Sequence, residues 1–458
     1  MEYISTRNKN LSYNFKEIFL RGLAPDGGLF IPKKIDTYNQ SEIKKLSELS
    51  YADLATEIIG NFCSPELQKN NLRNLIKKSY KNFTTNEIIK IKKVGDINLI
   101  ELYHGPTLAF KDIAMQVLGN MYEELEVSSD KTVNIVVATS GDTGSAAISA
   151  LNNRKNINVF VLHPHNKISK IQRKIMTTIG SSNIYNLAIK GTFDDCQQIV
   201  KEMFSQNTFR EKINMSGVNS INWARIICQI VYYFYSAFKF KNKKINFSVP
   251  TGNFGDVYAG YVAKKMGLNI EKLIVATNEN DILERAINTG IYKPSKVKPS
   301  LSPSMDVQIS SNFERLLFDV LNQDDKQVAN LMSKLLSEGS FRLDKDQLQI
   351  IKKDFYSKKV TDKETLDIIK NYSEKHNFII DPHTATAIGA SKKIKDENEI
   401  LILGTAHPYK FLETIKRATS KEVEVPEQVN NILGKKEKYD ILENETSKVK
   451  NYILGKLS

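Results

Sequence analysis

Lys111 lies in a segment whose residue types could support covalent chemistry. In HGPTLAFKD, residues 104–112, this lysine stands between Phe110 and Asp112 and follows a rigid Gly-Pro turn. A lysine held against an aromatic ring and partly removed from water has a lowered pKa, which frees its amine to attack a carbonyl carbon and later to carry a proton. Because an arbitrary lysine is more often a solvated residue on a helix, other parts of the sequence must decide between these interpretations.

Three glycine-containing loops follow apolar runs of the sequence. They are TSGDTGS at residues 139–145, TGNFGD at 251–256 and GTAHP at 404–408. In open parallel sheets, ligands bind at the carboxyl ends of the strands, where the next helix directs its first N–H groups at an anion. Glycine after a strand is more often only a turn, but three such loops in one chain predict an anion site. TGNFGD is the candidate phosphate loop.

Other site classes find little support in the sequence. The chain has no GxxxxGK[ST] and no GxGxxG that opens a helix after a strand, so a P-loop or dinucleotide fold is disfavoured. His163 and His165 lack a third ligand at metal spacing, and we predict no metal. The cysteines at 63, 196 and 228 are too widely spaced for a zinc site or a disulfide framework. Because both nucleotide fingerprints are absent, the anion that the three loops would bind is not expected to be a nucleotide.

The pattern of apolar and polar residues changes near residue 90, and the new pattern indicates the elements that position these loops. Short β-branched runs then alternate with helical stretches; the runs are residues 133–138, 159–162, 247–249, 273–276 and 400–403. This alternation predicts parallel sheets covered by helices. Residues 1 to about 85 are instead typical of helices, for example at 41–48 and 67–78, and predict an N-terminal helical domain. The charged stretch from Glu422 is expected to be peripheral.

Length and composition bound the class of protein. A chain of 458 residues predicts two or three domains. With 41% hydrophobic and 26% charged residues, no apolar run of membrane-spanning length and no signal-peptide core, we expect a cytoplasmic protein that does not enter a membrane. The formal charge of +13 would suit nucleic acid, but the lysines are scattered as on solvated faces. A positive potential would equally attract small polyanionic substrates.

The motifs together resemble the threonine synthase family of fold type II pyridoxal-phosphate (PLP) enzymes over nearly the whole chain. HGPTLAFKD resembles the family's cofactor-lysine motif, and further segments resemble its other signatures in the same order. These segments are DGGLFIP (26–32), ATSGDTGSAA (138–147), NSINWARI (219–226), VPTGNFGDVYAG (249–260), ATNENDIL (276–283), SMDVQISSNFERLLF (304–318) and LGTAHPYKF (403–411). The resemblance implies a tryptophan synthase β-like α/β fold with two parallel-type subdomains. It places the family's N-terminal domain at residues 1–88 and the catalytic region at 89–458, with a C-terminal extension from about 422.

The resemblance also implies roles for particular residues. Lys111 would be the catalytic residue and carry PLP as a Schiff base. The other implied cofactor contacts are Asp142 near the ring hydroxyl, Thr405 at the pyridine nitrogen, and Gly252, Asn253, Phe254 and Gly255 around the phosphate. The implied substrate contacts are Ser140 and Thr143 for the carboxylate and Asn222 and Arg225 for the phosphate, since the arginine fork suits that group.

The implied reaction converts O-phospho-L-homoserine and water to L-threonine and phosphate, by a monomer or a homodimer that binds no nucleic acid. One alternative is another PLP lyase of the same fold, such as a threonine dehydratase or cysteine synthase; the N-terminal domain and SGDTG argue against it. A second is a non-catalytic threonine-synthase-like protein, or a basic nucleic-acid binder. The presence of Lys111, the GNFG loop and Thr405 disfavours a loss of catalysis.

Overall fold

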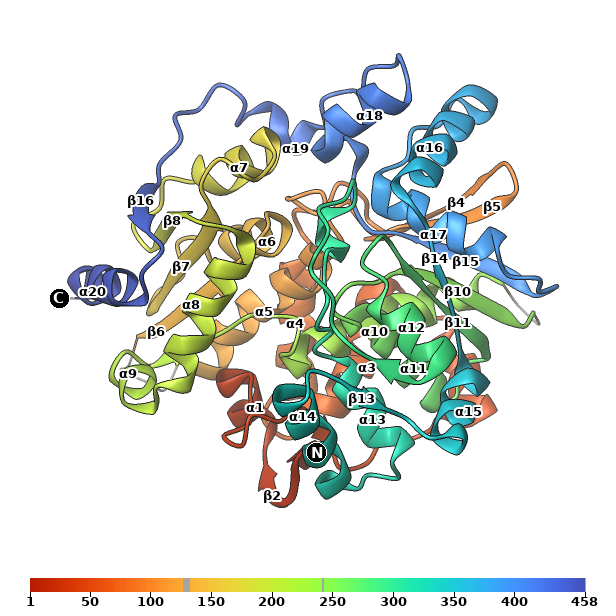
Figure 1. Cartoon of the computed structure of the whole chain (residues 1–458), viewed down its shortest axis with the longest axis horizontal. Helices are drawn as coiled ribbons and strands as arrows, with labels where there is room; N and C mark the ends of the chain where they lie inside the picture. Colours follow the sequence, from red (N-terminus) through yellow and green to blue (C-terminus); the bar gives the residue numbers. More distant parts are fainter. Residues whose placement is uncertain (127–131, 241–242, 458) are drawn as a thin grey trace.

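Two β-sheets that are largely or wholly parallel form the framework of the molecule (Figure 1). The computed structural model describes residues 1–126, 132–240 and 243–457. The larger sheet has six strands, in the order β14 (Phe355–Lys359), β11 (Ile270–Thr277), β10 (Ile245–Pro250), β15 (Glu399–Gly404), β5 (Ile97–Glu101) and β4 (Lys90–Val94). Strand β4 runs antiparallel to β5, and the other neighbours in this sheet pair in parallel.

The smaller sheet is parallel throughout and lies to the left in Figure 1. Its five strands are, in order, β16 (Asp440–Glu443), β8 (Ile184–Lys190), β7 (Ile157–Pro164), β6 (Val133–Ala138) and β9 (Met215–Ser216). Both faces of this sheet are covered: Ile135 and Val137 of β6 belong to the central hydrophobic core, whereas Val136 belongs to a separate outer cluster. Burial on both faces explains why the strand sequence VNIVVA is almost continuously apolar.

Helices cover both sheets. Those packed on or beside the smaller sheet are α5 (Lys111–Glu126), α6 (Asp142–Leu151), α7 (Lys170–Thr177), α8 (Phe193–Ser205), α9 (Asn207–Lys212) and α20 (Thr446–Leu457). Those on the side of the larger sheet are α10 (Trp223–Phe238), α11 (Gly255–Lys265), α12 (Ile282–Thr289), α13 (Phe313–Val320), α14 (Asp325–Ser337), α15 (Lys345–Asp354), α16 (Asp362–His376), α17 (Pro382–Lys392) and α18 (Leu412–Ala418). The predicted α/β fold class, with two subdomains built on parallel-type sheets, is confirmed.

The N-terminal region contains more than the predicted helices. Its helices are α1 (Phe15–Arg21), α2 (Gln40–Leu46), α3 (Tyr51–Cys63) and α4 (Lys69–Ser79). It also contains an antiparallel sheet of β1 (Tyr3–Ser5), β2 (Asn8–Tyr13) and β3 (Phe30–Pro32), which the sequence did not predict. The region shares the central core with the rest of the chain, for example through the Phe62 and Trp223 rings at 6.0 Å. The boundary near residue 88 therefore stays a prediction.

The C-terminal stretch crosses from the larger sheet to the smaller one (Figure 1). After α18 the chain passes through α19 (Glu427–Asn430) and then adds β16 in parallel to the edge of β8. Helix α20 buries Val449 and Ile453 in the outer cluster of the smaller sheet. Most residues of this stretch are exposed or half-buried, and its strand β16 forms the edge of the smaller sheet.

Within the described ranges, no helix combines the length and the apolarity that crossing a bilayer requires.

Candidate active site

A cavity of about 340 Å³ lies where strand ends from the two sheets face each other. Loop 139–145 leaves β6 of the smaller sheet, whereas loops 251–256 and 404–408 leave β10 and β15 of the larger one. Residues of all three loops line the cavity. The structure therefore brings together the glycine-containing loops that the sequence singled out, at the carboxyl ends of parallel strands.

Lys111 begins α5 and is held at the cavity by the third loop. The backbone N–H of Phe110 donates to the carbonyl oxygen of Thr405 at 2.9 Å, and Ala109 forms a β-bridge with Ala406. The Lys111 side chain is 12% exposed, and its Nζ lies 5.8 Å from the centroid of the Phe110 ring. The lysine is thus fixed beside an aromatic ring and largely out of water, as its motif predicted.

The turn before Lys111 explains the other residues of the motif. The N–H and the hydroxyl of Thr107 donate to the two carboxylate oxygens of Asp112, at 2.8 and 2.7 Å. Gly105 packs so closely on this turn that a Cβ there would come within 2.4 Å of the Asp112 Cβ. Glycine, threonine and aspartate therefore build a rigid support for the first turn of α5, from which Lys111 extends.

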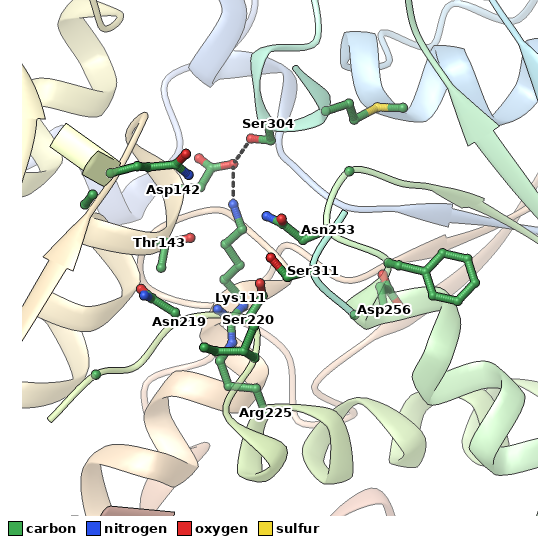
Figure 2. Close-up of a pocket in the computed structure, with 18 of the residues that line it drawn as sticks. Lys111, Asp142, Thr143, Asn219, Ser220, Arg225, Asn253, Asp256, Ser304 and Ser311 are labelled. Carbon is green, nitrogen blue, oxygen red and sulfur yellow. Dashed lines mark hydrogen bonds and ion pairs between the residues drawn. The ribbon is translucent and has the colours of Figure 1, made fainter. Parts of the chain in front are cut away.

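The surroundings of Lys111 lower the pKa of its amine. Burial lowers the pKa of Lys111 to about 8; Asp142 opposes this, whereas the cations of Arg225 and Lys410 add to it. The Asp142 Oδ2 lies 3.6 Å from Lys111 Nζ (Figure 2). A pKa of about 8 leaves roughly a tenth of the amine neutral at pH 7, far more than an ordinary lysine has, and a nucleophile or general base requires this neutral form.

Asp142 is the anion of the site and stands at the start of α6. Its Oδ1 accepts a hydrogen bond from Gln172 at 3.0 Å and pairs with Lys410, and its Oδ2 accepts from Ser304 Oγ at 3.1 Å. Burial alone would raise its pKa, but Lys410 and Lys111 hold the pKa of Asp142 well below its usual range. Asp142 is therefore ionised where the sequence placed a cofactor contact.

Loop 251–256 has the geometry of an anion cradle. Phe254 adopts a left-handed conformation with a φ of 63°, and α11 begins at the next residue, Gly255. The first N–H groups of a helix have no partner within it and favour an anion. A Cβ on Gly252 would lie 2.8 Å from the carbonyl oxygen of Ser304, so this position has room only for glycine. The loop thus places the start of α11 at the cavity, where its first N–H groups favour a phosphate.

Arg225 supplies a cation that the protein itself pairs only weakly. Its Nη1 donates to the carbonyl oxygen of Val218 at 3.4 Å, and its Nε has no partner among the described residues. Burial lowers the pKa of Arg225 to about 10. Nearby, Asp256 accepts hydrogen bonds from the hydroxyls of Tyr232 and Tyr233 and also lines the cavity. A buried guanidinium without full pairing is costly, and an anion in the cavity would satisfy it.

Two residues predicted to contact the substrate do not line the cavity. Asn222 caps α10: its Oδ1 accepts from the Ala224 N–H at 3.1 Å, and its Nδ2 donates to the Phe19 carbonyl oxygen at 2.9 Å. Ser140 is partly buried and also lies outside the lining. Within NSINWARI, the lining residues are instead Asn219, Ser220, Ile221 and Arg225. The other predicted site residues lie at the cavity, namely Lys111, Asp142, Thr143, Gly252, Asn253, Phe254, Gly255 and Thr405.

Several residues at or next to the cavity were not identified from the sequence. Lys410 pairs with Asp142, Ser304 donates to Asp142, and Asp256 and His383 line the cavity. Three of these four belong to the quoted motifs LGTAHPYKF, SMDVQISSNFERLLF and VPTGNFGDVYAG. Their motifs could have marked them as candidates, but their contacts depend on the fold.

Comparison with known proteins defines the class. The family model described as "Pyridoxal-phosphate dependent enzyme" matches residues 92–405. "Threonine synthase N terminus" matches residues 2–80, and "Threonine synthase, C-terminal" matches 384–453. The fold, the site and these matches define a PLP-dependent enzyme of fold type II.

Full-length relatives give the particular family. Threonine synthase from Pseudomonas aeruginosa is 39% identical over 99% of this chain and 98% of its own length, and that from Saccharomyces cerevisiae is 42% identical over 100% and 98%. The crystal structure of PLP-bound threonine synthase from Brucella melitensis superposes with a TM-score of 0.95 at 39% identity, covering 100% of this chain and 99% of that one. The yeast threonine synthase structure gives 0.93 at 41% identity, covering 100% and 98%. The chain belongs to the threonine synthase family.

The described residues fit the cofactor of this family. Lys111 offers an amine for the aldehyde of PLP, and loop 251–256 brings the start of α11, whose first N–H groups favour a phosphate, to the same cavity. Thr405 lines the same cavity and offers a neutral hydroxyl. The predicted family, cofactor and class of enzyme are confirmed, whereas the roles of individual residues stay predictions.

Proposed function

We propose that this chain converts O-phospho-L-homoserine and water to L-threonine and inorganic phosphate. The observation that carries the proposal is the buried amine of Lys111, in a cavity that also contains an N–H-rich loop and a weakly paired guanidinium. Cofactor and substrate each carry a phosphate, so the site needs two positions for anions. Loop 251–256 and Arg225 are suited to supply them.

Lys111 is proposed to hold the cofactor covalently and then to move protons. When bound, PLP supplies an electron-withdrawing ring that stabilises negative charge on substrate carbons. Lys111 would remove and return protons at Cα and the neighbouring carbons, while phosphate leaves from Cγ and water adds at Cβ. One amine can act as base and acid in turn only if its pKa lies near the working pH. The pKa of Lys111, about 8, supports this role.

The two ends of the substrate are assigned to different elements. Thr143 and the first N–H groups of α6 would bind the carboxylate, since a helix N-terminus favours an anion. Arg225, with Asn219 and Ser220 beside it in the lining, would bind the phosphate. Ser140 and Asn222 do not line the cavity and are not part of this assignment.

We also expect the enzyme to act in the cytoplasm, as a monomer or a homodimer, on its free substrate and without nucleic acid. Cell fractionation would test the cytoplasmic location, and light scattering would measure the oligomeric state. A filter-binding assay would show whether the protein binds nucleic acid.

The test is a product assay on the purified protein with added PLP. With O-phospho-L-homoserine we expect threonine and phosphate in equal amounts from the wild type and neither product from Lys111→Ala. Lys265→Met is the matched control, because Lys265 pairs with Asp319 at 2.6 Å and does not line the cavity. Borohydride-reducible PLP with a 2-oxo acid and no threonine would indicate a threonine dehydratase-like lyase. A failure to bind PLP would indicate a non-catalytic protein.

A further inference from the structure

A second buried lysine lies beside the candidate cofactor lysine. Lys410 is on the short helix η2 (Pro408–Phe411), directly after the third loop, and its side chain is 0% exposed. Its Nζ donates to the carbonyl oxygen of Thr107 at 3.0 Å and forms an ion pair with Asp142 Oδ1. Since Thr107 belongs to the motif that supports Lys111, Lys410 connects that motif, the first loop and the third loop.

Asp142 is shared between the two lysines through different oxygens. Its Oδ1 faces Lys410 and Gln172, whereas its Oδ2 faces Ser304 and lies 3.6 Å from Lys111 Nζ (Figure 2). Figure 2 also shows Arg225 on the opposite side of Lys111 from Asp142. One carboxylate thus lies between two lysine nitrogens, of which that of Lys410 is fully buried.

The charge balance at this point depends on Lys410. Burial disfavours the charged form of a carboxylate, so Asp142 stays ionised here because cations lie beside it. Lys410 contributes both a charge and a hydrogen bond that lower the pKa of Asp142, while Lys111 contributes mainly a charge. Without Lys410, Asp142 would have Lys111 as its main cation and would hold the proton of Lys111 more tightly.

We propose that Lys410 is a positioning residue that holds the Asp142 carboxylate beside Lys111, compensates its charge and thereby sets the proton occupancy of the Lys111 nitrogen. The inference rests on the proposed role of Lys111 as the cofactor-bearing lysine. The charge of Lys410 compensates the charge of Asp142. The Lys111 nitrogen therefore holds a proton less tightly than it would if Asp142 were present without Lys410.

Other charged or titratable groups face this cluster and stay unchanged in the test below. They are Arg225 on α10, which faces Lys111, His383 on α17, which faces Asp142, and Asp112 on α5 and His407 just before η2, which face Lys410. A shift that appears when Lys410 or Asp142 is replaced, and disappears when both are replaced, is therefore assigned to the pair itself.

The test is a spectrophotometric titration of the PLP-bound protein from about pH 6 to about pH 10, a range around the pKa values of amines in such sites. The measured quantity is the pH at which the absorbance of the bound cofactor changes by half. Four proteins are compared: wild type, Lys410→Met, Asp142→Asn and the double variant. Lys265→Met is the control for loss of a lysine–aspartate pair elsewhere, and Lys410→Arg tests rescue by a retained charge.

The two single variants should shift this midpoint in opposite directions. Lys410→Met leaves Asp142 uncompensated and should raise the midpoint, whereas Asp142→Asn leaves Lys410 uncompensated and should lower it, each by about one pH unit or more. The double variant restores neutrality and should return to within about 0.3 of the wild type. Lys410→Arg and Lys265→Met should match the wild type.

The proposal is overturned if both single variants shift the midpoint in the same direction, or if all four spectra titrate alike. A purely structural role of Lys410 would give such a result. If the wild type shows no midpoint within this pH range, the proposal requires that one of the two single variants shows a midpoint within it. If Lys410→Met does not fold, Asp142→Asn and the double variant decide the outcome.

Failure of this inference can be separated from failure of the proposed function. Borohydride reduction of the wild type, followed by peptide mass spectrometry, shows whether Lys111 holds the cofactor. Threonine formation by the wild type tests the reaction. Neither measurement depends on Lys410.

Discussion

Gly252→Ala is a small change with a calculable effect on cofactor binding. In the structure the new Cβ would lie 2.8 Å from the Ser304 carbonyl oxygen and 3.3 Å from the Met305 Cα. Both are backbone atoms of the turn at η1 (Pro303–Met305), which cannot rotate away as a side chain can. Either this turn or the phosphate loop must therefore move.

The required movement sets the size of the effect. Ordinary contact begins at 3.4 Å, so the two segments must separate by about 0.6 Å from their 2.8 Å approach. Overpacking of this kind costs about 1–3 kcal/mol. If that cost falls on the loop that holds the phosphate, the dissociation constant for PLP rises by about 5-fold to about 150-fold. Ser304 also donates to Asp142, so the cofactor spectrum should change as well.

PLP titration followed by fluorescence would measure the affinity, and urea unfolding of the cofactor-free protein would show how much of the cost falls on stability. Gly180→Ala is the matched control, because a Cβ at Gly180 has nothing within 4 Å. Unchanged PLP affinity together with unchanged unfolding in Gly252→Ala would refute the steric reasoning, since it would mean that the two segments separate freely.

Three further predictions concern Lys111 and Arg225. Lys111→Ala should abolish turnover with an unchanged circular dichroism spectrum; retained activity would refute the assigned chemistry. The rate at which cofactor-free protein takes up PLP should rise with pH and level off above about pH 8, because only the neutral amine attacks and the pKa of Lys111 is about 8; a stopped-flow rate that falls over this range would contradict the assignment. Arg225→Leu should raise KM for O-phospho-L-homoserine at least about tenfold with little loss of folding stability, since it removes a weakly paired buried cation. Arg154→Leu, which removes an arginine paired with Glu123 outside the cavity lining, should leave KM unchanged.

The central strands could be predicted because their sequences reflect burial on both faces. The predicted run at residues 133–138 has the bounds of β6, and the other four predicted runs fall within β7, β10, β11 and β15. The N-terminal sheet could not be predicted in the same way. Strands β1 and β3 have three residues each, and β2 is mostly exposed and polar, so none has the apolar run or alternation that marks a strand.

The candidate site was predictable where a motif determines local geometry and not where the geometry depends on distant contacts. Lys111 and the three loops follow from short segments. Ser304 and Asp142, by contrast, are 162 residues apart, and no local pattern indicates their hydrogen bond. Asn222 shows the opposite limit: an asparagine directly before a helix is a typical N-cap, and here the side chain makes the capping bond and does not line the cavity.

The strand order has a consequence for biosynthesis on the ribosome. Strand β15 (Glu399–Gly404) lies between β10 and β5, and β16 (Asp440–Glu443) forms the edge of the other sheet. Strands β5 and β10, made long before, have no direct pairing with each other in the finished protein. During translation, β5 and β10 lack their shared partner until β15 has emerged, and β8 lacks its outer partner until β16 has emerged, so the nascent polypeptide carries these unpaired strand edges until then.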